Sequence, residues 1–273
     1  MEGISIDENT GAYRIKELEV SITSRCHLRC DNCGFYIPNQ PNPGATEAIV
    51  DEIEQCLFYL ENLKITIGSI AILGGEPTSA PILLDEAVLK FSRFKNIESI
   101  EVVTHGLTPH GLSKQALNGI SKLTISVYFE SEELQDLWRK FVKTFAPHVE
   151  LCFRTDKEWD KWTGDERVDD LQAQTMFDKC WYRKHCVTIE RKRLFLCSRI
   201  AKLPSDEEGI ILTSNTSLED IKRYLNQEKF LMSCKSCTPM MGLPTVRAGK
   251  QSDNRIEKMI PKAISYLQEQ IGQ

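Results

Sequence analysis

The chain has 273 residues, enough for one large α/β domain or for a core with a small appendage. Its 39 acidic and 34 basic residues give a net charge of −5, and without any basic stripe this argues against a nucleic-acid partner. No apolar run reaches the ~18 residues of a membrane span, and the acidic start is unlike a signal peptide, so we expect a cytoplasmic protein without membrane attachment.

Short apolar runs alternate with amphipathic helical patterns over the first two-thirds of the sequence. The expected strands cover residues 18–23, 69–73, 100–104, 123–128 and 149–154, and the expected helices cover 45–63, 82–94, 113–120 and 132–145. This alternation predicts an α/β fold with a parallel sheet, most of a TIM-like barrel. In such barrels the functional residues lie on the loops that follow the strands.

The pattern changes after about residue 161, where charged and turn-rich sequence leads into a segment with five cysteines. We expect a hairpin over 186–197 that turns around Arg191, then a helix over 217–225 and a closing helix over 255–270. The sequence therefore predicts two parts: a barrel core at 1–165, and a small module with a closing helix at 166–273.

Three cysteines, Cys26, Cys30 and Cys33, follow the first expected strand with the spacing C-x3-C-x2-C. This spacing suits three corners of a cubane [4Fe–4S] cluster better than a zinc site, which usually uses two closely spaced pairs of ligands. Three ligands for four irons leave one iron open to a small molecule. The total of ten cysteines also favours metal binding, because a reducing compartment disfavours disulfides.

Two further motifs follow the next two strands: Gly74-Gly75-Glu76-Pro77, and Thr104-His105-Gly106. Together with the cysteine loop they resemble the motifs of the radical S-adenosylmethionine (SAM) enzymes, with His105 where that family often has asparagine. The resemblance implies a partial (βα)6 barrel and an open iron that chelates the amino and carboxyl groups of SAM.

The resemblance also implies which residues hold SAM. Gly74 and Gly75 have no Cβ, so their backbone can approach the methionine amine, and Glu76 is expected to receive the ammonium. The other expected cofactor-binding residues are Pro77, Thr104, Ser126 and Arg154. Ser126 and Arg154 match positions that often hold the SAM ribose and carboxylate, although a strand serine is often a satisfied core hydroxyl and a rim arginine is often solvated.

The cysteines of the tail have the pattern Cys180-x5-Cys186-x10-Cys197-x36-Cys234-x2-Cys237. This pattern resembles the twitch or SPASM-like module that binds an auxiliary [4Fe–4S] cluster in several family members. Cys197, Cys234 and Cys237 are the expected ligands, with either Cys180 or Cys186 as the fourth. Four thiolates around a hairpin also suit Zn²⁺, so a zinc clip is the alternative.

Cys152, on the fifth expected strand, is the candidate catalytic thiol. A thiol that points into the barrel can return a hydrogen atom to a substrate radical, as an epimerase requires. The plainer interpretation is a buried strand cysteine. Whichever of Cys180 and Cys186 does not bind metal is an equal candidate.

These features predict a radical SAM oxidoreductase or epimerase of a biosynthetic pathway. Reduced by flavodoxin, ferredoxin or a similar one-electron donor, it would cleave SAM to a 5′-deoxyadenosyl radical that takes a hydrogen atom from a sugar, aminocyclitol or nucleoside. One short barrel with one auxiliary cluster is similar to the plan of 2-deoxy-scyllo-inosamine dehydrogenases.

Three alternatives stay open. The first is a peptide maturase, which we rank lower because only about seventeen residues precede the first expected strand, too few for a leader-binding domain. The second is a sulfur-inserting enzyme that sacrifices its auxiliary cluster. The third is a non-catalytic iron–sulfur electron-transfer protein, which would gain nothing from an open iron.

Overall fold

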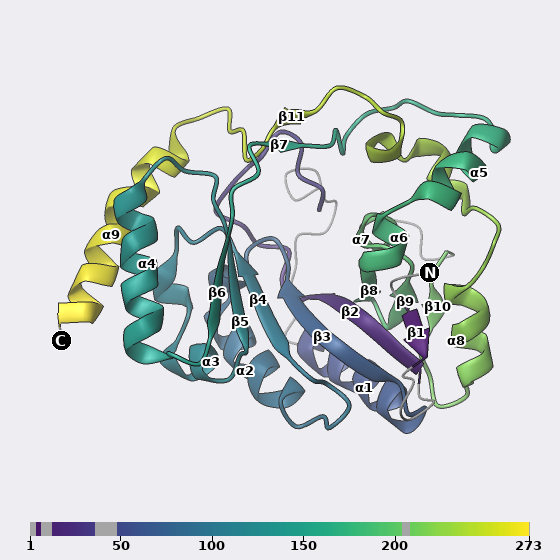
Figure 1. Ribbon diagram of the computed structural model, residues 1–273, viewed down its shortest axis with the longest axis horizontal. Helices are drawn as coiled ribbons and strands as arrows, with labels where there is room; N and C mark the ends of the chain where they lie inside the picture. Colours follow the sequence, from purple (N-terminus) through teal and green to yellow (C-terminus); the bar gives the residue numbers. More distant parts are fainter. Residues whose placement is uncertain (1–3, 7–12, 36–47, 204–207, 273) are drawn as a thin grey trace.

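The computed structural model describes residues 4–6, 13–35, 48–203 and 208–272 (Figure 1). In its first part, five parallel strands alternate with four helices, as the sequence pattern predicted. In chain order these elements are β2 (Tyr13–Ser21), α1 (Ala48–Asn62), β3 (Thr66–Leu73), α2 (Pro81–Phe91), β4 (Ile100–Thr104), α3 (Lys114–Asn118), β5 (Lys122–Ser126), α4 (Glu132–Phe145) and β6 (Glu150–Arg154). The strands lie side by side in the order β2-β3-β4-β5-β6, which is the curved wall of a partial barrel.

The second part of the chain extends the same sheet. Its elements are β7 (Glu158–Trp159), α5 (Asp170–Lys179), α6 (Tyr182–His185), β8 (Val187–Glu190), β9 (Arg193–Phe195), α7 (Ser198–Ala201), β10 (Ile210–Ile211), α8 (Leu218–Leu225), β11 (Val246–Arg247) and α9 (Arg255–Gly272). Strand β8 pairs in parallel with β2, with Leu18 beside Val187, on the edge of β2 that faces away from β3. A sixth parallel strand is therefore present, but it lies beside the first barrel strand and not after the fifth.

Two short strands complete the pairing. Strand β1 (Ile4–Ile6) pairs antiparallel with the start of β2, and β7 pairs antiparallel with β11 in a separate ribbon. Figure 1 shows this ribbon above the strand ends, where the chain crosses from the tail module towards α9. Helix α9 then packs beside α4 at the edge of the barrel.

Helix α4 shows how directly the pattern of apolar residues determines the fold. It covers the predicted residues, Glu132–Phe145, and it begins where the Ser131 hydroxyl accepts a hydrogen bond from the backbone N–H of Leu134. Its apolar side chains recur at helical spacing and are buried: Leu134, Leu137, Trp138, Phe141 and Val142. The helix ends at Ala146, the residue before Pro147.

The predicted hairpin is formed by β8 and β9. Its turn consists of Arg191 and Lys192, which have φ values of 49° and 58°. Two successive residues with positive φ are typical of the type I′ turn, whose twist suits a two-residue hairpin. The backbone therefore adopts the usual hairpin geometry without the glycine that such turns commonly contain.

Helix α5 was not predicted, because its sequence is dominated by polar residues. Asp169 begins the helix by accepting a hydrogen bond from the backbone N–H of Gln172. Ala173, Met176 and Phe177 form its narrow buried face, at the spacing i, i+3, i+4. Three buried apolar positions in ten residues were enough for a helix here because the rest of the tail module covers them.

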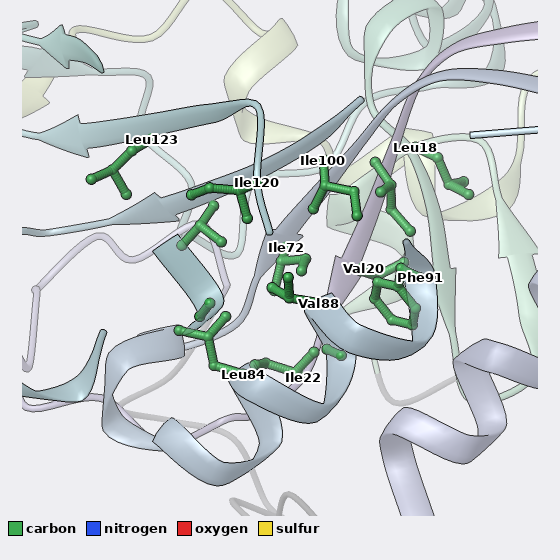
Figure 2. Close-up of a cluster of buried hydrophobic side chains, with 14 of the residues drawn as sticks. Leu18, Val20, Ile22, Ile72, Leu84, Val88, Phe91, Ile100, Ile120 and Leu123 are labelled. Atoms are coloured by element: carbon green, nitrogen blue, oxygen red, sulfur yellow. The ribbon is translucent and has the colours of Figure 1, made fainter. Parts of the chain in front are cut away.

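The two faces of the sheet differ in chemistry. Figure 2 shows apolar strand residues packed with helix α2, and all of these belong to one buried core: Leu18, Val20, Ile72 and Ile100 with Leu84, Val88 and Phe91. Alternate residues of β2 point to the other side. That concave side carries Glu17 and Glu19, and Glu101 of β4 accepts a hydrogen bond from Thr124 of β5. The barrel interior is therefore polar, in contrast to the apolar outer face.

All five parallel strands of the first part end at one edge of the sheet. Their register places Ser21 beside Leu73, Thr104 beside Ile125, and Ser126 beside Arg154. The loops with the predicted motifs follow these ends and so meet on one side of the barrel. Within the described part of the chain, no helix combines the length and apolarity needed to cross a bilayer.

Candidate functional site

The three-cysteine loop leaves the end of β2 and lies against the barrel edge. Cys30 is buried, and Cys26 and Cys33 are half-buried. Burial raises the pKa of Cys30 to about 11, and the charge of the neighbouring Cys33 adds to that rise. Burial also raises the pKa of Cys26, and the charges of Cys30 and Cys33 make smaller contributions to that rise. The three sulfurs therefore lie close enough to influence one another.

This donor set fits an iron–sulfur cluster. Thiolates that share a half-buried loop repel one another, and a cationic iron core relieves that repulsion. The loop also supplies its own support for a charged sulfur, since the backbone N–H of Leu28 donates to Cys26 Sγ at 3.3 Å. Each thiolate of a cubane binds a different iron, so the sulfurs surround a group of atoms and need not converge on one ion. Among the described residues, no three His, Cys, Asp or Glu side chains converge on a single-ion position.

The Gly74-Gly75 loop after β3 packs directly on the backbone of the cysteine loop. The N–H of Gly75 donates to the carbonyl of Thr23, and the N–H of Glu76 donates to the carbonyl of Arg25, both at 2.7 Å. A Cβ on Gly75 would lie 2.3 Å from the Arg25 carbonyl oxygen. The absence of a Cβ thus allows the two motif loops to join.

Glu76 links the same loop to the end of β4. Its Oε1 accepts hydrogen bonds from the Thr78 hydroxyl and the Thr104 hydroxyl, both at 2.7 Å, and from the Thr78 N–H at 3.1 Å. Its Oε2 accepts from the N–H of His105 at 2.8 Å. The carboxylate is 2% exposed. These bonds join the Gly74–Thr78 loop to the end of β4, and the expected contact of Glu76 with the SAM ammonium stays a prediction.

His105 completes this cluster. Its Nδ1 accepts a hydrogen bond from the N–H of Leu107 at 3.0 Å, so the proton of the neutral ring is on Nε2. That Nε2 lies 3.4 Å from Glu76 Oε2. Burial lowers the pKa of His105 against the opposing effect of the Glu76 charge. The residue at the family's asparagine position therefore faces the carboxylate as a neutral imidazole.

We predict a large loss of stability for Glu76→Ala. The change leaves the Thr104 hydroxyl and the N–H groups of Thr78 and His105 buried without this acceptor, which should lower the free energy of unfolding by about 3 kcal/mol. Urea denaturation measures this, with Glu257→Ala on the exposed side of α9 as the control. A loss below about 0.5 kcal/mol, the range of ordinary surface substitutions, would contradict this role.

Ser126 and Arg154 are neighbours at the ends of β5 and β6. Ser126 is buried and Arg154 is exposed. Burial raises the pKa of the nearby Tyr128 phenol, and the charge of Cys30 contributes a smaller part of that rise. The structure therefore brings these two predicted SAM-binding residues to the same edge as the cysteine loop.

Cys152 lies in the middle of β6, where it pairs in register with Thr124. Its neighbours Leu151 and Phe153 pack against the outer core, so Cys152 belongs to the concave face of the sheet. It is half-buried. Its role as a hydrogen donor stays a prediction.

The cysteines of the tail separate into two environments. One pocket, with an empty volume of ≈ 420 Å³ including its open mouth, is lined by Cys180, Cys197, Cys234 and Cys237. Among the described residues lining that pocket, Cys186 is not found; its thiol is buried, and the charge of Glu19 on the concave face adds to the rise that burial causes in its pKa. The pocket therefore brings Cys180 together with the other three cysteines, and leaves Cys186 beside β2.

Arg199 supplies positive charge to this pocket and was missed in the sequence. It is 6% exposed, and its two terminal nitrogens donate to the carbonyls of Trp162 and Ser236 at 2.6 Å each. Burial raises the pKa of Cys237 to about 11, and Arg199 counteracts part of that rise. A buried arginine beside four thiolates offsets the negative charge that they bring to any metal centre. Its position two residues after Cys197 was the only signal in the sequence.

The structure defines a class of protein. A partial parallel barrel with a three-cysteine loop after one strand and a Gly-Gly-Glu-Pro loop after the next is the architecture of the radical SAM enzymes. Comparison with solved structures shows that the chain has the fold of the crystal structure of BtrN in complex with AdoMet and 2-DOIA. The TM-score is 0.51 at 14% identity, over 88% of this chain and 96% of that one.

Sequence comparison agrees. A stretch of 100 residues is 32% identical to GTP 3′,8-cyclase 2 of Mycobacterium tuberculosis, covering 37% of this chain and 26% of that protein. A stretch of 112 residues is 30% identical to molybdenum cofactor biosynthesis protein 1 of Homo sapiens, covering 40% and 17%. The matches span only about a quarter or less of these relatives, and no protein-family model matches the chain. The predicted α/β barrel fold is confirmed, and the partial sequence matches agree with the predicted resemblance to the radical SAM enzymes.

Proposed function

We propose that this protein uses SAM and two [4Fe–4S] clusters to oxidise a polar small molecule by hydrogen-atom abstraction. The observation that carries the proposal is the division of the cysteines into a set of three on the barrel edge and a set of four around a pocket. In this proposal Cys26, Cys30 and Cys33 hold the first cluster. Cys180, Cys197, Cys234 and Cys237 hold the second.

A three-thiolate cluster with SAM at its open iron supplies the electron that cleaves SAM and yields a 5′-deoxyadenosyl radical. The residues of this chain bind and orient SAM. The Gly74–Pro77 loop presents its backbone beside the cysteine loop, Thr104 and Glu76 fix that loop in place, and Ser126 and Arg154 are proposed to hold the ribose and carboxylate. The tail crosses above these strand ends and helps to exclude water (Figure 1).

The ligand count of the second site favours oxidation. Four thiolates satisfy all four irons of a cubane and leave no open position for a substrate atom. We therefore propose that a cluster held by these four cysteines would serve as the one-electron acceptor for the substrate radical, which would also release a proton, and would not bind the substrate. The reductant proposed for the first cluster is an external one-electron donor such as flavodoxin or ferredoxin.

The concave face favours a substrate with several polar groups. Burial raises the pKa of Glu17, with the charge of Glu101 as a second cause, and the charges of Lys122 and Arg154 oppose it. A face with both carboxylates and cations suits hydroxyl and amino groups at several positions of one molecule. Sugars, aminocyclitols and nucleosides have this character.

The test is release of 5′-deoxyadenosine. We expect anaerobically reconstituted protein to release it from SAM under dithionite, and to release more when a suitable polyol or aminocyclitol is present. Liquid chromatography with mass detection measures both 5′-deoxyadenosine and a product two mass units lighter than the substrate. A protein with both clusters loaded that releases no 5′-deoxyadenosine would contradict the proposal.

One observation favours epimerisation as a second candidate. Cys186 lies outside the four-cysteine pocket, and burial, followed by the charge of Glu19, raises the pKa of its thiol, which keeps the S–H intact. An intact thiol is what a hydrogen-atom donor requires. A product of unchanged composition with one deuterium from D2O would support epimerisation, whereas a product two mass units lighter supports oxidation.

A further inference from the structure

The segment between β11 and α9, residues 249–255, lies across the three-cysteine loop, and we call it the strap. The carbonyl of Lys250 accepts a hydrogen bond from the N–H of Asp31 at 3.0 Å. Arg255 Nη1 donates to the carbonyl of His27 at 2.7 Å. Residues from the far end of the chain therefore hold the loop that carries the first three cysteines.

Gln251, in the middle of the strap, contacts a cysteine sulfur. Its Nε2 donates to Cys30 Sγ at 2.9 Å and to the carbonyl of Gly249 at 3.0 Å. Its Oε1 accepts from the N–H of Arg29 at 2.6 Å. A backbone N–H can only donate, so the oxygen of the amide must face Arg29 and the NH2 group must face the sulfur.

From this geometry we infer that Gln251 is a positioning residue that sets the reduction potential of the cluster held by Cys26, Cys30 and Cys33. The inference rests on the proposed function, because it requires that cluster. A hydrogen bond to a ligating sulfur stabilises the more negatively charged, reduced state of a cluster and so raises its potential. Gln251 supplies such a donor from the tail module to the site of SAM cleavage.

Two neighbouring residues of the strap support the loop in different ways, Lys250 through its backbone and Gln251 through its side chain. Lys250 contacts the loop through its backbone carbonyl, and its side chain is 61% exposed in an ion pair with Asp31. The Lys250 side chain can therefore be removed while the backbone hydrogen bond stays. Gln251 alone among these strap contacts places a side-chain donor on a sulfur. A change of potential that follows Gln251 and not Lys250 identifies the amide.

The experiment is a redox titration followed by electron paramagnetic resonance, on full-length protein reconstituted anaerobically with iron and sulfide. The SAM-site cluster is recognised as the reduced signal that changes when SAM is added, since a four-thiolate cluster has no open iron for SAM. Gln251→Leu removes the donor. Gln251→Glu keeps the acceptor for Arg29 and places a carboxylate oxygen against the sulfur at about pH 8, well above the ordinary pKa of Glu.

We expect a more negative midpoint potential in Gln251→Leu, a further negative shift in Gln251→Glu, and no change in the control Lys250→Ala. An unchanged potential in fully loaded Gln251→Glu would overturn the inference, and so would an equal shift in Lys250→Ala. If Gln251→Leu fails to load iron, Gln251→Glu decides alone. The absence of any SAM-responsive signal from the wild type would be a separate failure, that of the proposed function, and would remove the inference with it.

Discussion

The variant in which Cys26, Cys30 and Cys33 are all replaced by alanine is expected to release no 5′-deoxyadenosine, while it retains about four irons with matching sulfide after anaerobic reconstitution. The substitutions remove all three thiolates of the loop after β2. The four cysteines around the tail pocket lie on other elements and stay intact. Iron and labile-sulfide analysis measures the result, against about eight irons expected in the wild type.

The matched control for this variant is Cys56→Ala. Cys56 is a buried residue of α1 at 1% exposure and belongs to neither cysteine set. Its pKa is raised chiefly by burial. We expect this variant to keep both clusters and to lose only the modest stability of a small core truncation. About one zinc and no iron in the triple variant would show that the tail is a zinc clip, and the two-cluster proposal would fail.

Cys180→Ser and Cys186→Ser are expected to differ sharply, although the two cysteines are only six positions apart. Cys180 lines the pocket with Cys197, Cys234 and Cys237, and the charges of these neighbours affect one another's pKa values. Its replacement should reduce the iron content from about eight to about four and stop the proposed two-electron oxidation. Cys186→Ser should keep about eight irons, because Cys186 does not line the pocket with the other four cysteines.

The measurement for this pair is iron content together with product analysis. We expect Cys180→Ser to still release 5′-deoxyadenosine, because the first site is intact, and to give no oxidised product. The reverse pattern, with iron lost from Cys186→Ser and retained in Cys180→Ser, would reassign the fourth ligand. Loss of iron from neither variant would mean that three thiolates are enough to hold the second cluster.

The sequence was most informative where a structure depends on nearby residues. The β4 strand and the α4 helix have the predicted bounds, because strict patterns of apolar residues define both. The hairpin at Arg191 was found for the same reason, since its two strands are adjacent in the chain. The three-cysteine loop was recognised from its spacing and the Gly-Gly-Glu-Pro loop from its resemblance to a family motif, and the register of the strands then placed them on one edge.

Apart from helix α5, the features that sequence reasoning missed depend on contacts between distant parts of the chain. Gln251 reaches Cys30 across 221 positions, and Arg199 reaches Trp162 across 37, and neither spacing forms a local motif. The choice between Cys180 and Cys186 was open because both flank the same short helix, α6, and only the folded module separates their thiols. The buried hydrogen bonds of Glu76 to Thr104 and His105 likewise became visible only when β3 and β4 were placed together.

The position of β2 has a consequence for how the protein is assembled. Leu18 pairs with Val187, so the strand that pairs with this edge of β2 is synthesised roughly 170 residues later. Until then the half-made barrel exposes unpaired backbone groups beside the loop proposed to hold the first cluster, a condition that favours aggregation. Insertion of the first cluster and docking of the tail hairpin would therefore both involve β2 during biogenesis. Conditions that limit iron should lower the yield of folded protein by prolonging the life of this open-edged intermediate.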